Sequence, residues 1–277
     1  MNICVVTVTY GNRFHILEKV LNSLIQEDIK EIIVVDNGSS QESQQALNSF
    51  RSKCTIPIQV ILMGKNTGSA KGFKTGLEMA LQTSYEYIWV LDDDNLPLSD
   101  TLSILKKYWN QLVSPENYSS IALLSNRIDR QNFLKVLRTQ RPDDILQKNN
   151  NFMGFHWGEM WEKIYERIMK RNPHENIKME DMPVYTKVSA APYGGLFLHR
   201  KLLEQYGLPP EEYVLYMDDF AFTLPITRNG GTLYLIKDSI LEDVERSLYL
   251  PKSKKWLHHT LFESKETVAY YSMRNMH

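Results

Sequence analysis

Short apolar runs alternate with helix-like segments through the first half of the chain. The runs are rich in β-branched residues, as strands buried on both faces are, and they occupy residues 3–9, 31–35, 56–63, 87–91 and 121–124. Between them, apolar residues recur at helical spacing at 14–25, 70–81 and 97–113, and Ser39 or Ser40 is placed to cap a helix through position 50. This alternation predicts an α/β fold, with a mostly parallel sheet flanked by helices.

The second half follows a different pattern. Residues 127–187 are polar and carry scattered aromatic side chains, so we interpret them as an insertion with helical parts, chiefly at 157–171. Strand character returns at 194–199 and 231–236. The segment between these strands, 218–228, is predicted to begin as a helix and to be disturbed by Pro225.

These patterns favour one domain over residues 1–245, because no internal repeat or low-complexity linker divides it. We divide this domain into a first half at 1–126, the insertion at 127–187 and a second half at 188–245, followed by a C-terminal extension at 246–277.

Composition excludes several classes of protein. The net charge is −1, with 32 basic and 33 acidic residues, so we expect no nucleic-acid partner. Two cysteines give no disulfide framework, which fits a reducing cytosol. No signal-type segment or membrane-length apolar stretch occurs. We therefore expect a cytoplasmic protein, or one that contacts the inner membrane face only at its surface.

Polar residues follow four of the predicted strands. These groups are Thr9 to Asn12, Asp36 to Ser39, Asn66 to Gly68, and Asp92 to Asp94. In an open α/β sheet, ligands bind outside the carboxyl ends of the strands, so the four groups predict one crevice. The alternative is that each group simply forms a turn.

Three consecutive carboxylates, Asp92, Asp93 and Asp94, would repel one another, so a positive charge is expected beside them. Hard cations such as Mn²⁺ or Mg²⁺ take carboxylate oxygens and leave positions open for phosphate oxygens. In an extended chain, Asp92 and Asp94 point the same way and Asp93 points the other way. The alternative is a solvated acidic turn that caps the next helix.

A second acidic pair, Asp218 and Asp219, stands at the predicted start of a helix. One carboxylate can face the crevice and take a proton from an acceptor hydroxyl, while the other caps the helix. With a metal ion steadying a departing diphosphate, no general acid is needed. The alternative is a pure helix cap.

Glycines at 68, 72 and 76 lie on one face of the helix predicted at 70–81. This spacing lets the helix approach the sheet closely and keeps its N-terminus open to a phosphate or a sugar. Packing alone explains the same spacing, and the phosphate-binding loop pattern with its lysine is absent.

Five motifs together resemble family 2 glycosyltransferases, which have the Rossmann-like GT-A fold. They are Val-Thr-Val-Thr-Tyr-Gly-Asn-Arg at 6–13, Ile-Val-Val-Asp-Asn-Gly-Ser at 33–39, Asn-Thr-Gly-Ser-Ala-Lys-Gly-Phe at 66–73, Trp-Val-Leu-Asp-Asp-Asp at 89–94 and Asp-Asp-Phe-Ala-Phe at 218–222. The resemblance covers the first hundred residues and 190–244, and it is strongest to bacterial galactofuranosyl- and rhamnosyltransferases.

The resemblance implies an inverting enzyme that moves a sugar from a UDP- or dTDP-sugar to an acceptor hydroxyl in bacterial surface polysaccharide. The sugar would be galactofuranose, rhamnose or a hexopyranose, and the acceptor a glycan or a lipid-linked glycan. It implies that Asp219, or Asp218 next in line, is the catalytic base. The implied contacts to the nucleotide sugar are Thr9, Tyr10, Asp36, Asn66, Gly68, Lys71, Asp92 and Asp93.

The implied metal ligands for Mn²⁺ or Mg²⁺ are Asp92 and Asp94. Relatives often place a histidine near 239–243, but this sequence has none there, so Glu242, Asp243 or water completes the set, or His258 and His259 fold back. On the acceptor side, Gly194 and Gly195 follow from the resemblance. We add Trp157, because the aromatic residues of 149–183 suit a lid over sugar rings; core packing is the alternative.

Two other functions compete. A sugar-nucleotide nucleotidyltransferase would share the crevice, but the glycine-rich basic loop it needs after the first strand is absent. A degenerate nucleotide-sugar-binding module is disfavoured by the intact acidic pairs. Lysines among apolar residues at 252–262 suit an anionic membrane surface, although a helix packed on its own domain explains them too. Relatives usually continue beyond the last matched residues, so we expect a longer natural chain.

Overall fold

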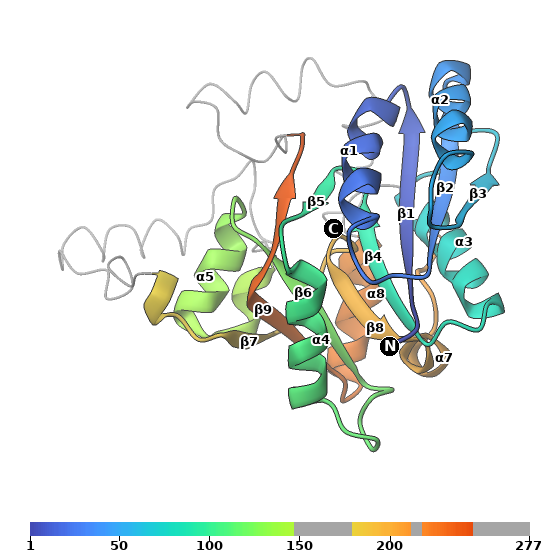
Figure 1. Ribbon diagram of the computed structural model, residues 1–277. Coiled ribbons are helices and arrows are strands. Elements are labelled where there is room, and N and C mark those ends of the chain that lie inside the picture. The colour runs from blue at the N-terminus through green and yellow to red at the C-terminus, as the bar shows by residue number, and fades with distance from the viewer. Residues whose placement is uncertain (147–178, 212–217, 246–277) are drawn as a thin grey trace, which may run out of the picture.

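The computed structural model describes residues 1–146, 179–211 and 218–245, and these form an α/β domain (Figure 1). The strands are β1 (Ile3–Gly11), β2 (Glu31–Ser39), β3 (Ile58–Leu62), β4 (Tyr87–Asp92), β5 (Asn95–Pro97), β6 (Ile121–Arg127), β7 (Tyr185–Val188), β8 (Leu196–His199) and β9 (Thr232–Asp243). The α-helices are α1 (Phe14–Leu24), α2 (Gln41–Arg51), α3 (Ser69–Gln82), α4 (Thr101–Leu112), α5 (Gln131–Thr139), α7 (Arg200–Tyr206) and α8 (Asp218–Arg228). Short 3₁₀ turns occur at Pro142–Ile145 and Met179–Asp181.

All of the described strands belong to one nine-stranded sheet, ordered β3-β2-β1-β4-β8-β6-β9-β5, with β7 also paired to β9. Strands β1 to β4 are parallel, as predicted. Beyond β4 the sheet is mixed, because β8 runs antiparallel to both β4 and β6, and β5 and β7 run antiparallel to β9. The predicted α/β architecture is therefore confirmed, with its parallel part confined mainly to the first half.

Helices cover both faces of the sheet, and alternate strand residues point to each layer. In β1, Cys4, Val6 and Val8 belong to the core beneath α3, α5 and α8, whereas Ile3 and Val5 belong to the core beneath α1 and α4. Each fully buried aliphatic side chain of this kind stabilises the fold by about 1.5–3 kcal/mol relative to exposure. These two cores hold the carboxyl ends of β1, β2 and β4 at one edge.

Glycine permits the close approach of α3 to the sheet. A Cβ added at Gly72 would lie 2.8 Å from a methyl group of Val8, and one added at Gly76 would lie 2.5 Å from a methyl group of Val6. Real Cβ atoms do not tolerate such contacts, so these two glycines serve packing. Gly68 differs, because it precedes α3 at a φ of +91°.

Several predicted boundaries were wrong, including the end of the strand predicted at 231–236, which continues as β9 to Asp243. The helix expected from position 97 begins only at Thr101, because Asn95–Pro97 forms β5 and pairs with the distant strand β9. Helix α8 continues through Pro225 to Arg228, because Phe222 and Ile226 are buried in the core, and this burial offsets the one hydrogen bond that the proline cannot donate. The predicted cap of α2 is Ser40, whose hydroxyl accepts from the Ser43 amide at 3.3 Å.

Two described elements of the predicted insertion pack on the rest of the domain. Helix α5 buries Phe133, Val136 and Leu137 in the same core as β1, and β7 pairs with β9. Several predicted features lie outside the described residues: Trp157, the helix at 157–171, most of the aromatic segment at 149–183, His258, His259 and the basic segment at 252–262. Among the helices of the described part, none is long and apolar enough to cross a membrane.

Candidate functional site

Strand register brings the polar strand ends together. Thr9 of β1 pairs with Asp36 of β2, and Val8 pairs with Asp92 of β4. Because all three strands are parallel, their carboxyl ends lie side by side at one edge of the sheet, as Figure 1 shows. This arrangement confirms that these polar groups line one region, as their sequence positions predicted.

The loop before α3 is fastened to the same edge through Asn37. The Asn37 side chain donates to the Gly68 carbonyl at 2.9 Å and accepts from the Thr67 amide at 2.9 Å. Gly38 has a φ of +83°, and a Cβ there would lie 2.4 Å from the Asn66 nitrogen, so only glycine fits. Asn66 and Gly68 are thus held beside the end of β2.

Lys71 lies on the first turn of α3. Its side chain is exposed, and its Nζ lies 3.9 Å from a carboxylate oxygen of Glu211. An exposed pair at this distance contributes little stability, so the lysine stays available to an anionic group.

The triplet is not extended throughout, because Asp93 and Asp94 form the turn between β4 and β5, and Arg13 Nη2 lies 2.8 Å from an Asp93 oxygen and 4.0 Å from an Asp94 oxygen. The alternation predicted for an extended chain therefore does not apply to these two residues. Asp93 is the buried member of the triplet. It accepts from the Thr9 hydroxyl at 2.8 Å and from Arg13 Nε and Nη2 at 2.9 and 2.8 Å. Thr9 and Asp93 are each 4 % exposed. They therefore bond to each other within the crevice floor, and a direct contact of either with a nucleotide stays a prediction.

Arg13 links this floor to the surface. Its guanidinium also pairs with Glu245 and lies 5.1 Å from the centre of the Tyr10 ring. Tyr10 is 45 % exposed, so one face of an aromatic ring stands open at the end of β1. Such a ring can stack on a flat ligand.

Asp92 and Asp94 are the less committed members of the triplet. Asp92 Oδ2 lies 3.3 Å from Arg127 Nη1, and Asp94 Oδ1 accepts from the Asn95 amide at 3.1 Å. Burial raises the pKa of Asp94 to about 7, and the negative charges of Asp92 and Asp243 add to that rise. Burial also raises the pKa of Asp92, against the opposing effect of Arg127. Both carboxylates therefore stand in a local excess of negative charge.

Of the alternatives left open for β9, the structure brings Asp243 to this cluster. Asp243 lies opposite Asn95 in the β5–β9 pairing and accepts from Arg127, Arg130 and Asn95. Glu242 is exposed and, by strand alternation, points to the face opposite that of Asp243. The structure therefore does not place Glu242 beside Asp92 and Asp94, where it was predicted. Among the described residues, no group of three or more His, Cys, Asp or Glu side chains forms a preformed metal-binding site.

Asp218 and Asp219 begin α8 and form the second acidic group. Burial raises the pKa of Asp219 to about 8, and the charge of Asp218 adds to the rise. Burial also raises the pKa of Asp218. The charge of Asp92 contributes to both shifts, so the two acidic groups act on each other across one space.

Tyr193 is a buried aromatic residue whose electrostatic interactions involve Asp218 and Asp219. Its ring is buried and stacks on Phe73 with 4.2 Å between ring centres, and Phe222 lies beyond it. Burial raises the pKa of the Tyr193 hydroxyl, and the charges of Asp218 and Asp219 add to that rise.

Gly194 and Gly195 lie just before β8, and Gly194 packs against the triplet. A Cβ at Gly194 would lie 2.0 Å from Asn95 Oδ1 and 2.5 Å from Asp92 Oδ2, and Gly195 has a φ of +97°. Only a chain without side chains can pass here. Trp157, the other residue predicted for the acceptor side, lies outside the described residues.

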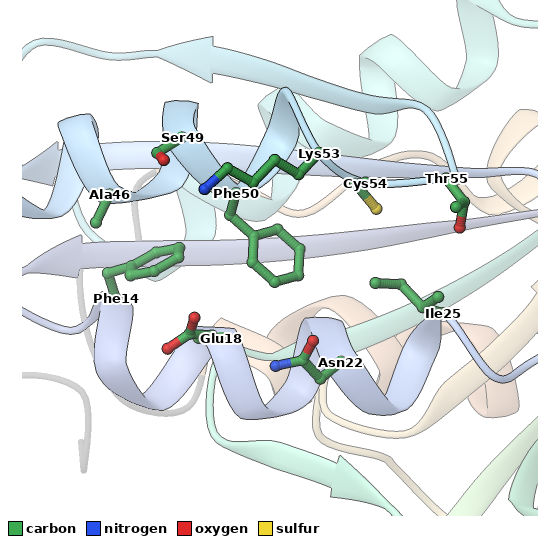
Figure 2. A pocket seen from close by; sticks show the side chains of 10 residues that line it. All are labelled: Phe14, Glu18, Asn22, Ile25, Ala46, Ser49, Phe50, Lys53, Cys54 and Thr55. Carbon is green, nitrogen blue, oxygen red and sulfur yellow. The ribbon is translucent and has the colours of Figure 1, made fainter.

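A separate hollow of about 480 Å³ lies between α1 and α2 (Figure 2). Phe14 and Phe50 meet edge to face across it, and Glu18 and Lys53 are its charged side chains. No member of either acidic group lines it. We therefore do not assign the candidate site to this hollow, but to the sheet edge that carries the triplet.

The family model described as Glycosyl transferase family 2 matches residues 4–181. This range includes Asp92 to Asp94 and the loops that contain Gly38 and Gly68. The chain belongs to glycosyl transferase family 2. This membership confirms the resemblance drawn from the five motifs.

Named relatives support the bacterial branch. The chain is 29 % identical over 102 residues to a galactofuranosyltransferase of Mycolicibacterium smegmatis, a match over 36 % of this chain and 32 % of that protein. It is 23 % identical over 97 % of its length to the GalNAc(5)-diNAcBac-PP-undecaprenol beta-1,3-glucosyltransferase of Campylobacter jejuni, 80 % of which is covered. It is 28 % identical over 35 % of its length to an abequosyltransferase of Salmonella typhimurium, 29 % of which is covered. Two of these three matches thus span only about a third of the relative.

Solved structures agree on the fold. The mannosyltransferase PcManGT of Pyrobaculum calidifontis, in complex with GDP-Man and Mn²⁺, superposes with a TM-score of 0.57 at 16 % identity, covering 99 % of this chain and 68 % of that one. S. aureus TarS in complex with UDP-GlcNAc superposes with a TM-score of 0.57 at 16 % identity, covering 100 % and 65 %. At 16 % identity, these superpositions establish that the chain has the GT-A fold and nothing further about its substrates.

Sequence reasoning missed the arginines of the site. Arg13, Arg127 and Arg130 were not among the predicted residues, although a positive charge was expected beside the triplet. The strand predicted at 121–124 extends to Arg127, and that extension carries the guanidinium into the crevice. The one available signal was Arg13, four positions after Thr9 within the first motif.

Proposed function

We propose that this chain transfers a sugar from a UDP- or dTDP-sugar to an acceptor hydroxyl, with inversion at the anomeric carbon. The observation that carries the proposal is that the parallel strands β1, β2 and β4 bring Thr9, Asp36 and Asp92 to one edge of the sheet, in a chain that belongs to glycosyl transferase family 2. The charge of Asp92 also adds to the raised pKa values of Asp218 and Asp219. The sugar is galactofuranose, rhamnose or a hexopyranose, and the product belongs to bacterial surface polysaccharide.

On the donor side, Asp36 and Tyr10 are suited to the base and ribose. Asp36 Oδ2 is buried without a hydrogen-bond partner among the described residues, and the Tyr10 ring stands open nearby. A buried acceptor atom without a donor is costly, so a ligand N–H or O–H group there is favoured.

Asp92 and Asp94 fit a hard divalent cation such as Mn²⁺ or Mg²⁺. Both are carboxylates with raised pKa values in excess negative charge, and neither is saturated by hydrogen bonds. Such a cation supplies charge compensation for a departing diphosphate. We assign it two protein ligands and leave the remaining positions to phosphate oxygens and water.

On the acceptor side, Asp219 removes the proton from the attacking hydroxyl, with Asp218 as the next candidate. A carboxylate with a pKa near 8 is a stronger base than an ordinary one, which favours proton transfer. One base and one displacement give inversion, by analogy with inverting glycoside hydrolysis. Gly194 and Gly195 remain the proposed acceptor-side backbone, and Gly194 packs directly against Asp92.

The acceptor is a glycan, free or lipid-linked, by analogy with the Campylobacter jejuni relative named for an undecaprenol-linked substrate. Such an acceptor would bring the protein to the cytoplasmic face of the inner membrane as a peripheral protein.

A screen of UDP- and dTDP-sugars for hydrolysis and transfer, with and without Mn²⁺, tests the proposal. We expect turnover with one sugar class and its loss in Asp94→Asn, together with at least about a tenfold loss of Mn²⁺-dependent UDP affinity by calorimetry. Pyrophosphate release from UTP and a sugar phosphate would replace the proposal with a nucleotidyltransferase. Binding of UDP with no turnover for any sugar would reduce the protein to a binding module, and a retained anomer by NMR would exclude the single base.

A further inference from the structure

Arg127 is a buried cation at the floor of the crevice. It ends β6, is 3 % exposed, and reaches two carboxylates on different strands. Its Nη1 lies 3.3 Å from Asp92 Oδ2, and its Nη2 donates to Asp243 Oδ1. One guanidinium thus ties the end of β4 to the end of β9.

Every hydrogen-bond acceptor position of the Asp243 carboxylate is occupied in this arrangement. Its side chain is 1 % exposed. It accepts from Arg127 Nη2, from Arg130 Nη2 at 2.9 Å and Nε at 3.2 Å, and from Asn95 Nδ2 at 3.2 Å. A carboxylate offers about four lone-pair positions, so these four donors leave none for a metal ion.

Asp92 is different in this respect. Its side chain is 35 % exposed, and the guanidinium occupies one oxygen, so the other side of the carboxylate stays open. A Cβ at Gly194 would lie 3.1 Å from Arg127 Nη1, so the glycine backbone closes over the ion pair and keeps it in place. A planar guanidinium with several donors fixes the direction of a carboxylate more strictly than a lysine would.

We propose that Arg127 is the positioning residue for Asp92, and that Asp243 holds Arg127 and is not a metal ligand. The inference rests on the proposed function, because the direction of Asp92 matters to the reaction only if Asp92 faces the donor. It also explains why an acid stands on β9 beside the triplet without completing a metal cage.

Asp243→Asn, Arg127→Lys and the double variant test the inference, with Mn²⁺ binding by calorimetry and sugar-nucleotide turnover as separate measurements. We expect each single variant to lose less Mn²⁺ affinity than Asp94→Asn, because both metal ligands remain, and to lose at least about tenfold in turnover. The double variant should be no worse than the poorer single one, because residues that act as a unit are not additive. Thermal unfolding confirms that each variant is folded.

Arg200→Lys is the matched control. Arg200 is half-buried, whereas Arg127 is buried, but it likewise makes structural hydrogen bonds, to the carbonyls of Leu81 and Thr83. It follows β8 at the opposite end of the β4 pairing. It should lose thermal stability without losing turnover per folded molecule.

Two results would overturn the inference and leave the proposed function standing. One is a loss of Mn²⁺ binding in Asp243→Asn as large as that in Asp94→Asn, which would make Asp243 a ligand. The other is a double variant whose loss is the product of the single losses, which would make the two residues independent. A wild-type protein that neither binds Mn²⁺ nor turns over any nucleotide sugar would instead contradict the proposed function, and the inference with it.

Discussion

Two groups of aspartates face the same crevice, but their surroundings differ. Arg13, Arg127 and Arg130 bond to the triplet on β4 and to its neighbour Asp243. In the part of the chain that the structure describes, no lysine or arginine forms an ion pair with Asp218 or Asp219, whose nearest polar neighbours include Tyr193 and Ser69.

The difference separates two kinds of chemistry. Carboxylates tied to guanidinium groups keep a fixed direction and suit the binding of charge. Carboxylates that are buried beside each other without a cation hold protons to higher pH and suit proton transfer. A sequence that shows only two runs of aspartate does not distinguish these roles, because the distinction comes from the neighbours.

The largest effect is expected from Asp219→Asn. Loss of the base should lower turnover by about a hundredfold or more, while UDP affinity with Mn²⁺ stays close to the wild-type value. This split is the reverse of that expected for Asp94→Asn, in which binding fails. Steady-state kinetics and calorimetry on both variants measure it, and near-normal turnover in Asp219→Asn would transfer the role of base to Asp218.

The pH dependence of turnover gives the next largest effect. The pKa of Asp219 is raised to about 8, and only the deprotonated carboxylate can accept a proton. Turnover at saturating donor should therefore rise with pH up to about 8, by nearly tenfold per unit at low pH, and then level off. Because Asp218 is adjacent, the midpoint belongs to the pair. The control variant Arg200→Lys keeps Asp219 and should give the same profile in the same buffers. A profile that is flat between pH 5 and pH 9, under conditions where the chemical step limits turnover, would contradict the assignment.

The smallest effect is expected from Tyr193→Phe. The Tyr193 hydroxyl lowers the pKa of Asp218, so its removal should raise the apparent pKa of the pair and move the midpoint of the turnover profile upward. The expected shift is less than about one unit, since burial and not this contact dominates the pKa. Mn²⁺ affinity is the internal control, because the triplet does not depend on Tyr193, and a downward shift of the midpoint would refute the contact.

The sequence by itself determined the parallel half of the sheet and the residues at its edge. Strands 3–9, 31–35 and 87–91 were recognisable because each is a local apolar run, and the acids after them were recognisable because strand ends and ligand sites coincide in this class of fold.

Tertiary structure decided what lies opposite those acids. β5 and β7 are strands only because β9 pairs with them, and α8 passes through Pro225 only because its apolar face is buried. Arg127 and Asp243 are separated by more than a hundred positions in the chain, and they meet because β6 and β9 run side by side. A local pattern shows that three aspartates need positive charge, but only the packing of distant strands determines which cation supplies it.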